Sequence, residues 1–437
     1  MAPRLRPPIP YRLAIRVAGA LAGLAALVSR RWRTAHQGRR ASRLRFAAWA
    51  RTARGSAPLI LFHASSAGEA RQAEPLLRRW RDRHPEYRVA FTWFSPSAEP
   101  AVAEFPVDVA GYLPTDTPGE VGRLLDGLRP TLVVVSKLDV WPEFVLAARA
   151  RGAGLALTAA TVRPSSGRLR WLARLATRSA YASFDLVAAI AEPDVWRLLR
   201  LGVRSEAITV TGDPRADAVL ERLAARPPDP ALQRLGAGPP ALVAGSTYPP
   251  DEDLLLDAFR TVTRTNPGAR LIIAPHQPRP AALARLRQAA ARRGLPAPVP
   301  LEAAGPDSSL VVLDRVGPLA WLYGAGQIAY VGGGFGPGGL HSVLEPAAWG
   351  LPILVGPRWR GNPDAQRLSA AGGLAALTGH RAGELAALWS RWLINVEERR
   401  LRGGEARAVL ERMRGAADRT VALLERYLVE APTITPS

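Results

Sequence analysis

Residues 58–80 read PLILFHASSAGEARQAEPLLRRW, and this stretch decides the fold class of the chain. The apolar run Leu59–Phe62 predicts a buried strand that ends at His63, and the charged segment after Gly68 predicts a helix. A strand, a tight turn and a helix make up the repeating unit of an α/β protein. The turn also places one carboxylate, Glu69, among small residues. Such an acid is either a first-turn residue that offsets the helix dipole or a functional group.

Short apolar runs alternate with longer amphipathic segments over most of the remaining chain, which predicts an α/β fold. Strands that are apolar at nearly every position suit parallel sheets that helices cover on both faces. Helix-length segments such as Glu143–Arg151 and Val195–Leu201 separate these runs. The predicted strands are Leu59–Phe62, Val89–Thr92, Thr131–Val135, Leu155–Thr158, Leu186–Ile190, Ala241–Ala244, Leu271–Ala274, Leu310–Leu313, Ile328–Val331 and Ile353–Val355.

A stretch rich in proline and glycine, RPPDPALQRLGAGPP (226–240), interrupts this alternation and predicts a linker between two domains. A chain of 437 residues is long enough for two substantial cores. Two doubly wound halves would bind ligands at the carboxyl ends of their strands. The predicted parts are a membrane-associating segment (1–40), a Rossmann-like acceptor domain (41–225), the linker (226–240), a Rossmann-like nucleotide-sugar domain (241–403), and a long helix with a disordered tail (404–437).

The composition favours an anionic partner. There are 58 basic and 37 acidic residues, which gives a formal net charge of +21. Lys137 is the only lysine, so the arginine excess reflects a general bias, and we predict no nucleic-acid partner. Because the chain has no cysteine, disulfides, thiolate metal sites and cysteine nucleophiles are excluded.

The N-terminal forty residues contain an apolar segment, Val17–Val28, with arginines on both sides. A full membrane span needs about 20 apolar residues, so a span from Tyr11 would require Arg16 to extend to the interface. The segment predicts a membrane anchor or an interfacial helix on an anionic cytoplasmic surface. A cleaved signal sequence and an ordinary buried helix are the alternatives.

The most glycine-dense stretch, Tyr330–Pro357, runs from a strand through a glycine loop toward a helix. Three of its glycines match the spacing GxGxxG, but a proline interrupts the turn and no ribose-binding acid follows about 20 residues later. Glycines do let a backbone approach a phosphate, and a helix N-terminus supplies free N–H groups. Ser342 and Glu345 have the spacing of a capping box. The loop is therefore either a phosphate site with Glu345 on a ribose or simply a strand ending.

Further polar residues follow predicted strands. His276 and Arg279 follow one in the second half, Lys137 and Asp139 follow one in the first half, and Arg215 comes shortly after the apolar pair Thr209 and Val210. Their shared position at strand ends makes them candidates for a ligand site, and His276 and Arg279 suit a phosphate. The six histidines lack the spacing of metal ligands, so we predict no metal site.

Seven motifs occur in order along the chain: HASSAGE, SKLDVWPEF, TGDPRAD, GSTYPPDE, APHQP, DRVGPLAWLYGAGQIAYVGGGF and GGLHSVLEPAAWGLPILVGP. Together they resemble the 3-deoxy-D-manno-octulosonic acid (Kdo) transferases of lipid A biosynthesis, from the N-terminal apolar segment to about Arg400. The resemblance implies a GT-B fold, with two Rossmann-like domains that face a central cleft and an N-terminal apolar helix.

That family implies transfer of Kdo from CMP-Kdo to a lipid A precursor, with inversion of the anomeric centre and without a metal or other cofactor. It also implies the cytoplasmic face of the cell inner membrane as the location. The expected partners are thus the lipid A precursor, the CMP-activated sugar and an anionic membrane surface.

The resemblance implies three catalytic residues. Glu69 falls on the family's catalytic base, which takes the proton from the acceptor hydroxyl. Asp139 matches an acid of the family's TELWP motif, and Lys137 replaces the acid two positions earlier. Arg215 stands where the family has a functional lysine, keeping the charge but not the geometry.

The resemblance also implies a site for the CMP-sugar. Its arginine is replaced here by histidine, its cytidine-contacting turn has lost an acid to proline, and its NPLE motif reads SVLE. The residues concerned are Pro275, His276, Val316, Gly317, Pro318, Ser342, Val343, Leu344 and Glu345. These replacements leave two alternatives to Kdo transfer open: a GT-B transferase or epimerase that uses another nucleotide sugar, and a degenerate, non-catalytic family member.

Overall fold

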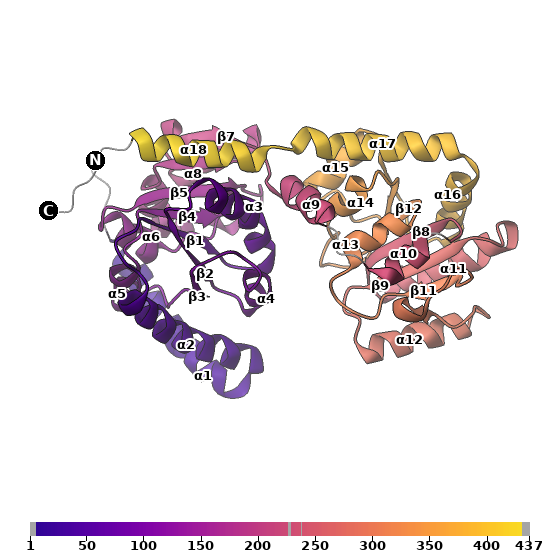
Figure 1. Ribbon diagram of the computed structural model, residues 1–437, viewed down its shortest axis with the longest axis horizontal. Helices are drawn as coiled ribbons and strands as arrows, with labels where there is room; N and C mark the ends of the chain where they lie inside the picture. The colour runs from indigo at the N-terminus through magenta and orange to yellow at the C-terminus, as the bar shows by residue number, and fades with distance from the viewer. Residues whose placement is uncertain (1–5, 226–228, 237, 431–437) are drawn as a thin grey trace. The chain divides into compact units, whose positions relative to one another are not determined.

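The computed structural model describes residues 6–225, 229–236 and 238–430. The chain forms two compact units (Figure 1). Unit 1 comprises Met1–Ala218 together with Met413–Ser437, and unit 2 comprises Val219–Arg412.

Unit 1 is built on a parallel sheet of seven strands in the order β3-β2-β1-β4-β5-β6-β7. The strands are β1 (Leu59–Ala64), β2 (Arg88–Trp93), β3 (Val109–Tyr112), β4 (Leu132–Ser136), β5 (Gly154–Ala160), β6 (Leu186–Ala189) and β7 (Ile208–Val210). The helices are α1 (Ile9–Val28), α2 (Arg30–Thr52), α3 (Ala67–Arg83), α4 (Glu99–Val102), α5 (Pro118–Leu128), α6 (Pro142–Arg149), α7 (Trp171–Ala182), α8 (Glu192–Leu201), α9 (Arg215–Ala224, which continues into unit 2) and α18 (Ala416–Glu430).

The central strands of unit 1 are apolar at successive positions because the sheet has a core on each face. Leu61 and Val133 belong to one buried cluster, whereas Phe62 and Val134 belong to another. Successive side chains of a strand point to opposite faces. A strand covered on both faces must therefore be apolar throughout.

Unit 2 repeats this architecture with the strand order β10-β11-β9-β8-β12-β13-β14, again all parallel. Its strands are β8 (Ala241–Thr247), β9 (Arg270–Pro275), β10 (Val299–Pro300), β11 (Leu310–Val312), β12 (Ile328–Val331), β13 (Ile353–Val355) and β14 (Leu374–Ala376). Its helices are α10 (Pro230–Gly236), α11 (Pro249–Thr265), α12 (Pro280–Ala291), α13 (Leu319–Leu322), α14 (Leu344–Ala348), α15 (Pro363–Ala370), α16 (Ala382–Ile394) and α17 (Val396–Met413).

The predicted fold class is confirmed: the chain has two doubly wound parallel sheets and an N-terminal apolar helix. All ten predicted strands are present. The four strands that were not predicted, β3, β7, β10 and β14, are the edge strands of the two sheets. Edge strands pair on one side only and are partly open to solvent, so β7 and β10 lack the buried apolar run that marks a central strand.

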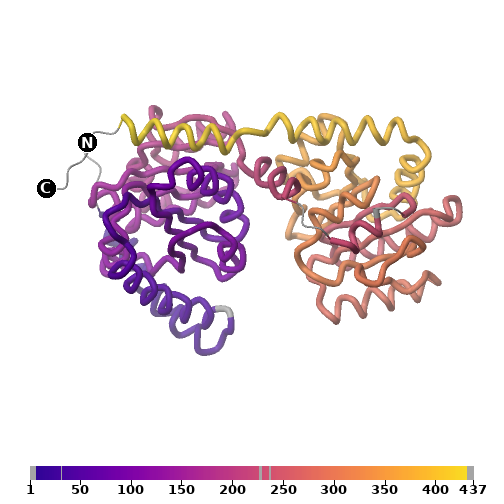
Figure 2. Tube along the Cα trace, viewed as in Figure 1, coloured from indigo at the N-terminus to yellow at the C-terminus, as the bar shows by residue number. Residues whose placement is uncertain are grey.

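The C-terminal segment differs from the single long helix that the sequence predicted. Two helices form instead, and Gly415, with φ of +83°, lies between α17 and α18. A φ in the left-handed region ends a helix and favours glycine. Helix α18 packs against α3 of unit 1, so the last helix and an early one lie side by side (Figure 2). The predicted tail at 431–437 lies outside the described residues.

The boundary between the units also differs from the predicted linker. It lies at Ala218–Val219, within α9. Of the predicted linker 226–240, residues 226–228 and 237 lie outside the described residues, and Pro230–Gly236 form α10. Prolines and glycines therefore mark a local interruption here, whereas the chain passes between the units along a helix.

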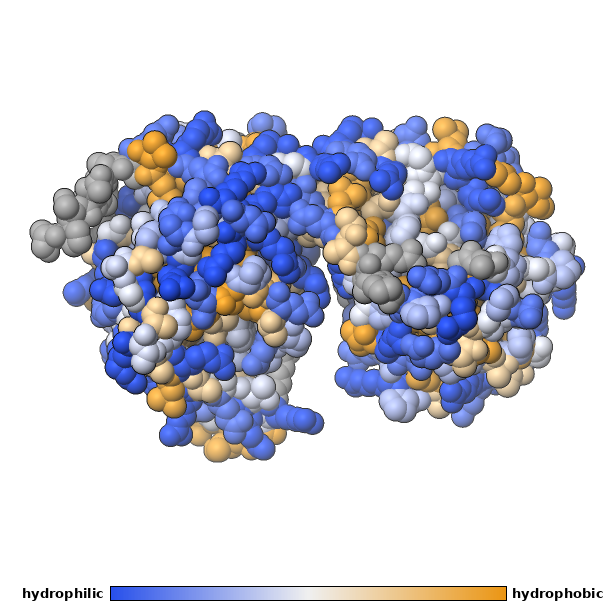
Figure 3. All heavy atoms as spheres, viewed as in Figure 1, coloured by the Kyte–Doolittle hydropathy of each residue, from blue (hydrophilic) through white to orange (hydrophobic). Residues whose placement is uncertain are grey.

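The N-terminal apolar segment is helix α1, which pairs with α2 as a hairpin on unit 1. Tyr11 donates a hydrogen bond to the buried carboxylate of Asp116 (2.6 Å), and Arg12 pairs with Glu143 (3.6 Å). Helix α1 is long and apolar enough to cross a membrane by length and composition. Its exposed apolar residues, here called the α1 stripe, are Ile9, Leu13, Val17, Leu21, Leu24, Leu27 and Val28. Orange spheres at the lower edge of unit 1 in Figure 3 mark apolar residues in this region.

Candidate functional site

Each sheet has a point next to its first strand at which the strand order reverses. In unit 1 it lies between β1 and β4, and in unit 2 between β8 and β12. Loops that leave neighbouring strands in opposite directions open a crevice at their carboxyl ends, where α/β proteins bind ligands. The predicted residues Glu69 and Asp139 follow β1 and β4, and the glycine loop follows β12. The two reversal points therefore coincide with the segments that the sequence singled out.

Glu69 lies in the first turn of α3, directly after β1. One of its carboxylate oxygens accepts a hydrogen bond from the backbone N–H of Ser65 (3.0 Å). The other lies 3.9 Å from the ammonium nitrogen of Lys137, and the Glu69 side chain remains 18% exposed. The first-turn role and the functional role are thus compatible, because only one oxygen is used to secure the turn.

Asp139 is the centre of a polar cluster at the end of β4. His63 Nε2 donates to its carboxylate at 3.3 Å, the Trp141 indole donates at 2.8 Å, and the Arg168 guanidinium lies at 3.7 Å. Burial opposes ionisation, but these partners outweigh it, with His63 foremost, and hold the pKa of Asp139 below its ordinary value. Asp139 is therefore a stably ionised carboxylate.

The sequence did not single out His63 or Arg168. His63 is fully buried, and its other ring nitrogen lies 3.0 Å from the hydroxyl oxygen of Thr92. A buried histidine between a hydroxyl and a carboxylate is held in one orientation. The sequence pattern could have identified His63 as a candidate site residue, because it ends an otherwise apolar strand immediately before the small residues of the turn.

Arg215, the third residue implied in catalysis, opens α9 in unit 1. Its guanidinium pairs with the buried carboxylate of Asp213, with the Nε donor at 2.8 Å. The backbone N–H of Arg215 also donates to Asp213 (3.0 Å). This pairing fixes the direction of the guanidinium at the start of the helix.

The glycine loop after β12 is packed closely at its beginning. A Cβ at Gly333, where φ is +94°, would meet the carbonyl oxygen of Gly339 at 2.4 Å, and one at Gly334 would meet the backbone of Gly356 at 2.6 Å. In contrast, a Cβ at Gly338 or Gly339 would meet nothing within 4 Å. The first glycines serve backbone packing, and the later ones leave the open surface that a ligand could approach.

Asp251, a buried acid of α11, secures this loop. It accepts hydrogen bonds from the backbone N–H groups of Gly333 (3.2 Å) and Tyr248 (2.9 Å) and from the hydroxyl of Tyr330 (2.7 Å). Burial raises the pKa of Asp251 in spite of these three donors. Asp251 belongs to the motif GSTYPPDE, but the sequence did not predict this role for it.

Three rings stack beside the loop. The ring centres of His276 and His341 are 4.5 Å apart, and that of Tyr248 lies 5.0 Å from His276. Burial, followed by the charge of His276, lowers the pKa of His341. Pro275 is the buried last residue of β9, and the N–H of His276 donates to the carbonyl of Thr247 at 2.9 Å. His276 is thus brought to the glycine loop, together with His341, which the sequence had not singled out.

The helix after the glycine loop starts one residue later than a cap at Ser342 would require. Helix α14 starts at Leu344 and has five residues, and Val343, not Ser342, is its N-cap. The capping box is therefore wrong: the Ser342 hydroxyl donates to the Glu345 carboxylate. The reason is that residues 339–343 have no regular secondary structure, and that Val343 and Leu344 are buried in the core.

The turn Val316, Gly317 and Pro318 lies just before α13. Val316 is 86% exposed, and Gly317 has φ of +125°. Helix α13 packs near α14, because the Trp349 indole donates to the carbonyl of Ala320 at 2.7 Å. The turn therefore leads into a helix that neighbours the one carrying Glu345.

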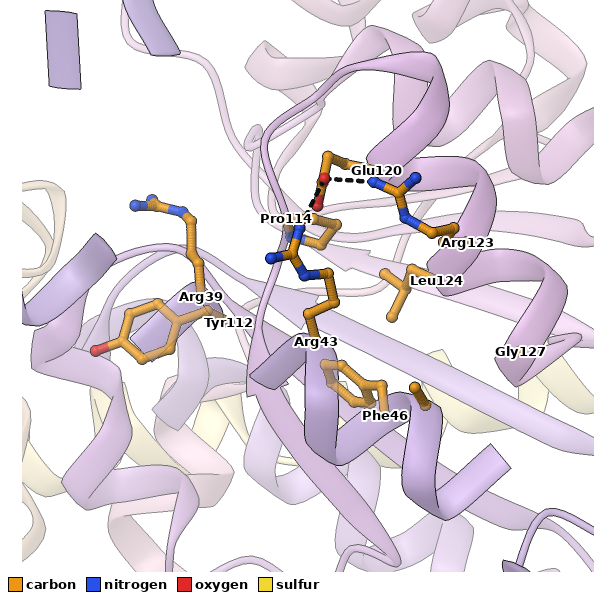
Figure 4. Close-up of a pocket in the computed structure, with 10 residues that line it drawn as sticks. Arg39, Arg43, Phe46, Tyr112, Pro114, Glu120, Arg123, Leu124 and Gly127 are labelled. Atoms are coloured by element: carbon orange, nitrogen blue, oxygen red, sulfur yellow. Dashed lines mark hydrogen bonds and ion pairs between the residues drawn. The ribbon is translucent and has the colours of Figure 1, made fainter. Parts of the chain in front are cut away.

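Two further observations concern ligand sites. Within residues 6–225, 229–236 and 238–430, no three His, Cys, Asp or Glu side chains are grouped as metal ligands would be. A pocket of about 80 Å³ lies between α2, β3 and α5 of unit 1, and its lining includes none of the predicted residues (Figure 4). Glu120 pairs there with both Arg43 and Arg123.

Comparisons with known proteins give the family. A family model described as 3-deoxy-D-manno-octulosonic-acid transferase (kdotransferase) matches residues 39–218. The 3-deoxy-D-manno-octulosonic acid transferase of Bordetella pertussis is 32% identical, over 86% of this chain and 90% of that protein. The enzyme of the same name from Haemophilus influenzae is 27% identical, over 84% and 87% of the respective chains.

Solved structures show the fold. A crystal structure of a UDP-N-acetylglucosamine 2-epimerase has a TM-score of 0.61, with 16% identity and coverage of 87% of this chain and 98% of that chain. The Neisseria meningitidis UDP-GlcNAc 2-epimerase bound to UDP-GlcNAc also has a TM-score of 0.61, with 15% identity over 84% and 99% of the respective chains. At these identities the likeness supports the fold alone, whereas the sequence relatives give the family. The chain therefore belongs to the 3-deoxy-D-manno-octulosonic acid transferase family.

Proposed function

We propose that this chain is an inverting glycosyltransferase that moves Kdo from CMP-Kdo to a lipid A precursor. The family supports the class of reaction. The observation that carries the proposal is the position of Glu69, a partly exposed carboxylate at the strand-order reversal of unit 1. In open α/β sheets, this is where a reacting group is presented to a ligand.

Glu69 acts as the general base in this proposal. As the acceptor hydroxyl oxygen bonds to the anomeric carbon of Kdo, its proton passes to Glu69, and the bond from that carbon to the phosphate of CMP breaks. CMP leaves with the electron pair of that bond. One-step displacement from the face opposite the leaving group inverts the anomeric centre. General-base catalysis of this kind contributes about 10²- to 10⁴-fold to a rate.

The CMP-sugar is assigned to unit 2. We propose that His276 and the open backbone at Gly339 bind the phosphate, and that Glu345 accepts hydrogen bonds from the ribose hydroxyls. The stacked rings and the open part of the glycine loop support this assignment. Pro275, the Val316–Pro318 turn and the SVLE segment complete the proposed site.

Asp139 and Arg215 are given separate roles. Asp139 is proposed to hold His63 and Trp141 in place next to the proposed site of unit 1. Its carboxylate already accepts hydrogen bonds from those two side chains. Arg215 is proposed to offset the charge of the leaving phosphate. Neither this chemistry nor that of the base requires a metal ion.

The acceptor is a lipid, and we propose that unit 1 meets it at the cytoplasmic face of the inner membrane. The α1 stripe supports this location. Helix α7 adds the exposed residues Trp171, Leu172 and Leu175. Tryptophan and leucine on a surface rich in arginine suit an anionic lipid interface.

The test is transfer from CMP-Kdo to a purified lipid A precursor, with CMP release and the mass of the lipid product as readouts. The wild-type chain should add Kdo, and Glu69→Gln should lower kcat by about a hundredfold or more because the base is lost. Glu74→Gln is the matched control, since Glu74 lies on the same helix and pairs with Arg78. This control should keep the wild-type rate.

Two outcomes contradict the proposal. Undiminished transfer by Glu69→Gln removes Glu69 as the base. An absence of product from the wild-type chain, together with calorimetric binding of UDP but not of CMP, replaces the Kdo donor with another nucleotide sugar.

A further inference from the structure

The only lysine of the chain lies beside the proposed base. The chain has 58 basic residues, and every one except Lys137 is arginine. A guanidinium is a broad planar fork, whereas an ammonium is a compact point charge on a flexible stem. Where a surface charge alone is needed, this chain uses arginine. Lys137 therefore stands out as a position that requires a small, movable cation.

The backbone at Lys137 is held in an uncommon conformation. Its φ is +65°, in the left-handed region that non-glycine residues rarely adopt. The N–H of Lys137 donates to the carbonyl of Thr158 at the end of the neighbouring strand β5 (2.7 Å). Such a conformation persists only where the surroundings enforce it, and it is concentrated at functional sites. The sharp turn directly after β4 directs this side chain toward α3.

The Lys137 side chain forms an ion pair with Glu69 but makes no hydrogen bond to it. The ammonium nitrogen lies 3.9 Å from the nearer Glu69 oxygen, which is an ion pair but longer than a hydrogen bond. This contact satisfies none of the three N–H donors of the ammonium. The Lys137 side chain is 38% exposed, so a ligand can reach it.

The nearby carboxylate of Asp139 does not compete for Lys137. It already accepts hydrogen bonds from His63 and Trp141 and pairs with Arg168. Glu69, in turn, is secured by the N–H of Ser65. The Lys137 ammonium thus has free donor capacity and lies next to the carboxylate that is proposed to act as base.

We propose that Lys137 binds an anionic oxygen of the substrate next to Glu69. This inference rests on the proposed function. Kdo carries a carboxylate on the carbon at which transfer occurs, so that a second anion comes close to Glu69 during the reaction. A phosphate on the lipid acceptor would be a second source of the same chemistry. In either case the ammonium bridges the incoming anion and Glu69 and offsets the repulsion between them.

The kinetic test uses Lys137→Met, which keeps the stem and removes the charge. The KM for one substrate should rise about tenfold or more, while kcat changes less, because a binding contact is lost. A rise in the KM for CMP-Kdo identifies the sugar carboxylate as the anion. A rise in the KM for the lipid, which disappears with a dephosphorylated lipid, identifies the acceptor phosphate. Lys137→Arg should restore part of the loss, since it returns the charge with a different geometry.

The matched control is Arg129→Met. Arg129 also has a left-handed backbone, with φ of +46°, but it caps the C-terminus of α5 at the opposite end of the strands. Removing its charge should leave both KM values unchanged. If the wild-type chain is active and Lys137→Met has the same KM values, the inference is overturned. If the wild-type chain itself is inactive, the proposed function is contradicted instead.

A second test uses the wild-type chain and does not depend on folding of a variant. Because Lys137 carries the only side-chain amine, acetylation with an amine-reactive ester reports on one position, and the α-amino group provides an internal reference. Saturating CMP-Kdo or lipid A precursor should slow acetylation of Lys137 several-fold and leave the α-amino group unaffected. Equal acetylation with and without both substrates overturns the inference.

Discussion

At the scale of single residues, the first-unit site depends on neighbours that neutralise its charges. Asp139 is stabilised as an anion by His63, Trp141 and Arg168. A carboxylate with such partners contributes to folding only while it is ionised.

The residue-scale prediction concerns Asp139→Asn. Because the folded-state pKa is lowered, the contribution of Asp139 is present above its ordinary pKa of about 3.9 and is lost as the pH falls through the lower folded-state value. At pH 7 the variant should unfold with a free energy about 2 kcal/mol smaller than the wild type. The difference should stay constant down to about pH 5 and narrow below it. Urea unfolding followed by tryptophan fluorescence, from pH 8 to about pH 3.5, measures this.

The control for this prediction is Asp126→Asn. Asp126 pairs with Arg151, but its side chain is 67% exposed, so the expected loss is under about 1 kcal/mol. The difference in unfolding free energy between the wild type and Asp139→Asn should not grow toward acidic pH. A difference that grows would contradict the assignment of Asp139 as a stabilised anion.

At the scale of secondary-structure elements, α1 has two distinct faces. One is held to unit 1 by Tyr11 and Arg12, and the other carries the α1 stripe. A helix that is held along one side and apolar along the other suits the plane of a membrane interface. The structure thus supports an interfacial helix as the form of the proposed membrane contact.

At this scale, the prediction concerns a double variant in which Leu21 and Leu24 are both replaced by glutamine. Leu21 and Leu24 are 60% and 63% exposed, so the double replacement should not disturb the core of unit 1. Binding to anionic phosphatidylglycerol vesicles should weaken about tenfold or more, because apolar area no longer enters the lipid. Vesicle sedimentation measures this loss.

The control double variant is Leu401→Gln with Val429→Gln. Both residues are exposed apolar residues outside α1, at 66% and 86%. Their replacement should leave vesicle binding unchanged. Equal binding by the α1 double variant and the wild type would remove the stripe from the membrane contact.

At the scale of the whole molecule, the last helix completes the first unit. Ala417, Val421 and Leu424 of α18 are fully buried in the same cluster as Leu77 and Trp80 of α3. Asp418 also pairs with Arg79 at 3.0 Å. Unit 1 is therefore discontinuous in sequence, and a cut between the two predicted Rossmann-like domains would leave it without one of its helices.

The whole-molecule prediction is that a chain ending at Met413 is destabilised in unit 1. Losing the buried valine and leucine alone removes roughly 3–6 kcal/mol, which is a large part of the stability of a typical domain. We expect a lower Tm and rapid proteolysis within residues 6–218. A chain that ends at Glu430 retains α18 and serves as the control, and it should match the full chain. Equal Tm values for the chains ending at Met413 and Glu430 would contradict this role of α18.

The sequence by itself determined the fold class, the central strands and the family, because these depend on local periodicity and on ordered motifs. A strand buried on both faces is apolar at successive positions, and that pattern is visible without neighbours. Residues 58–80 therefore predicted both the strand–turn–helix unit and the acid, Glu69, at its turn.

Only the tertiary structure decided the edge strands, the return of α18 to unit 1 and the partners of the site residues. Each of these depends on contacts between residues that are far apart in the chain. His63 reaches Asp139 across 76 positions, and Asp251 reaches Gly333 across 82. Local periodicity carries no information about such pairs, which exist only because parallel strands bring their carboxyl ends to one edge of a sheet.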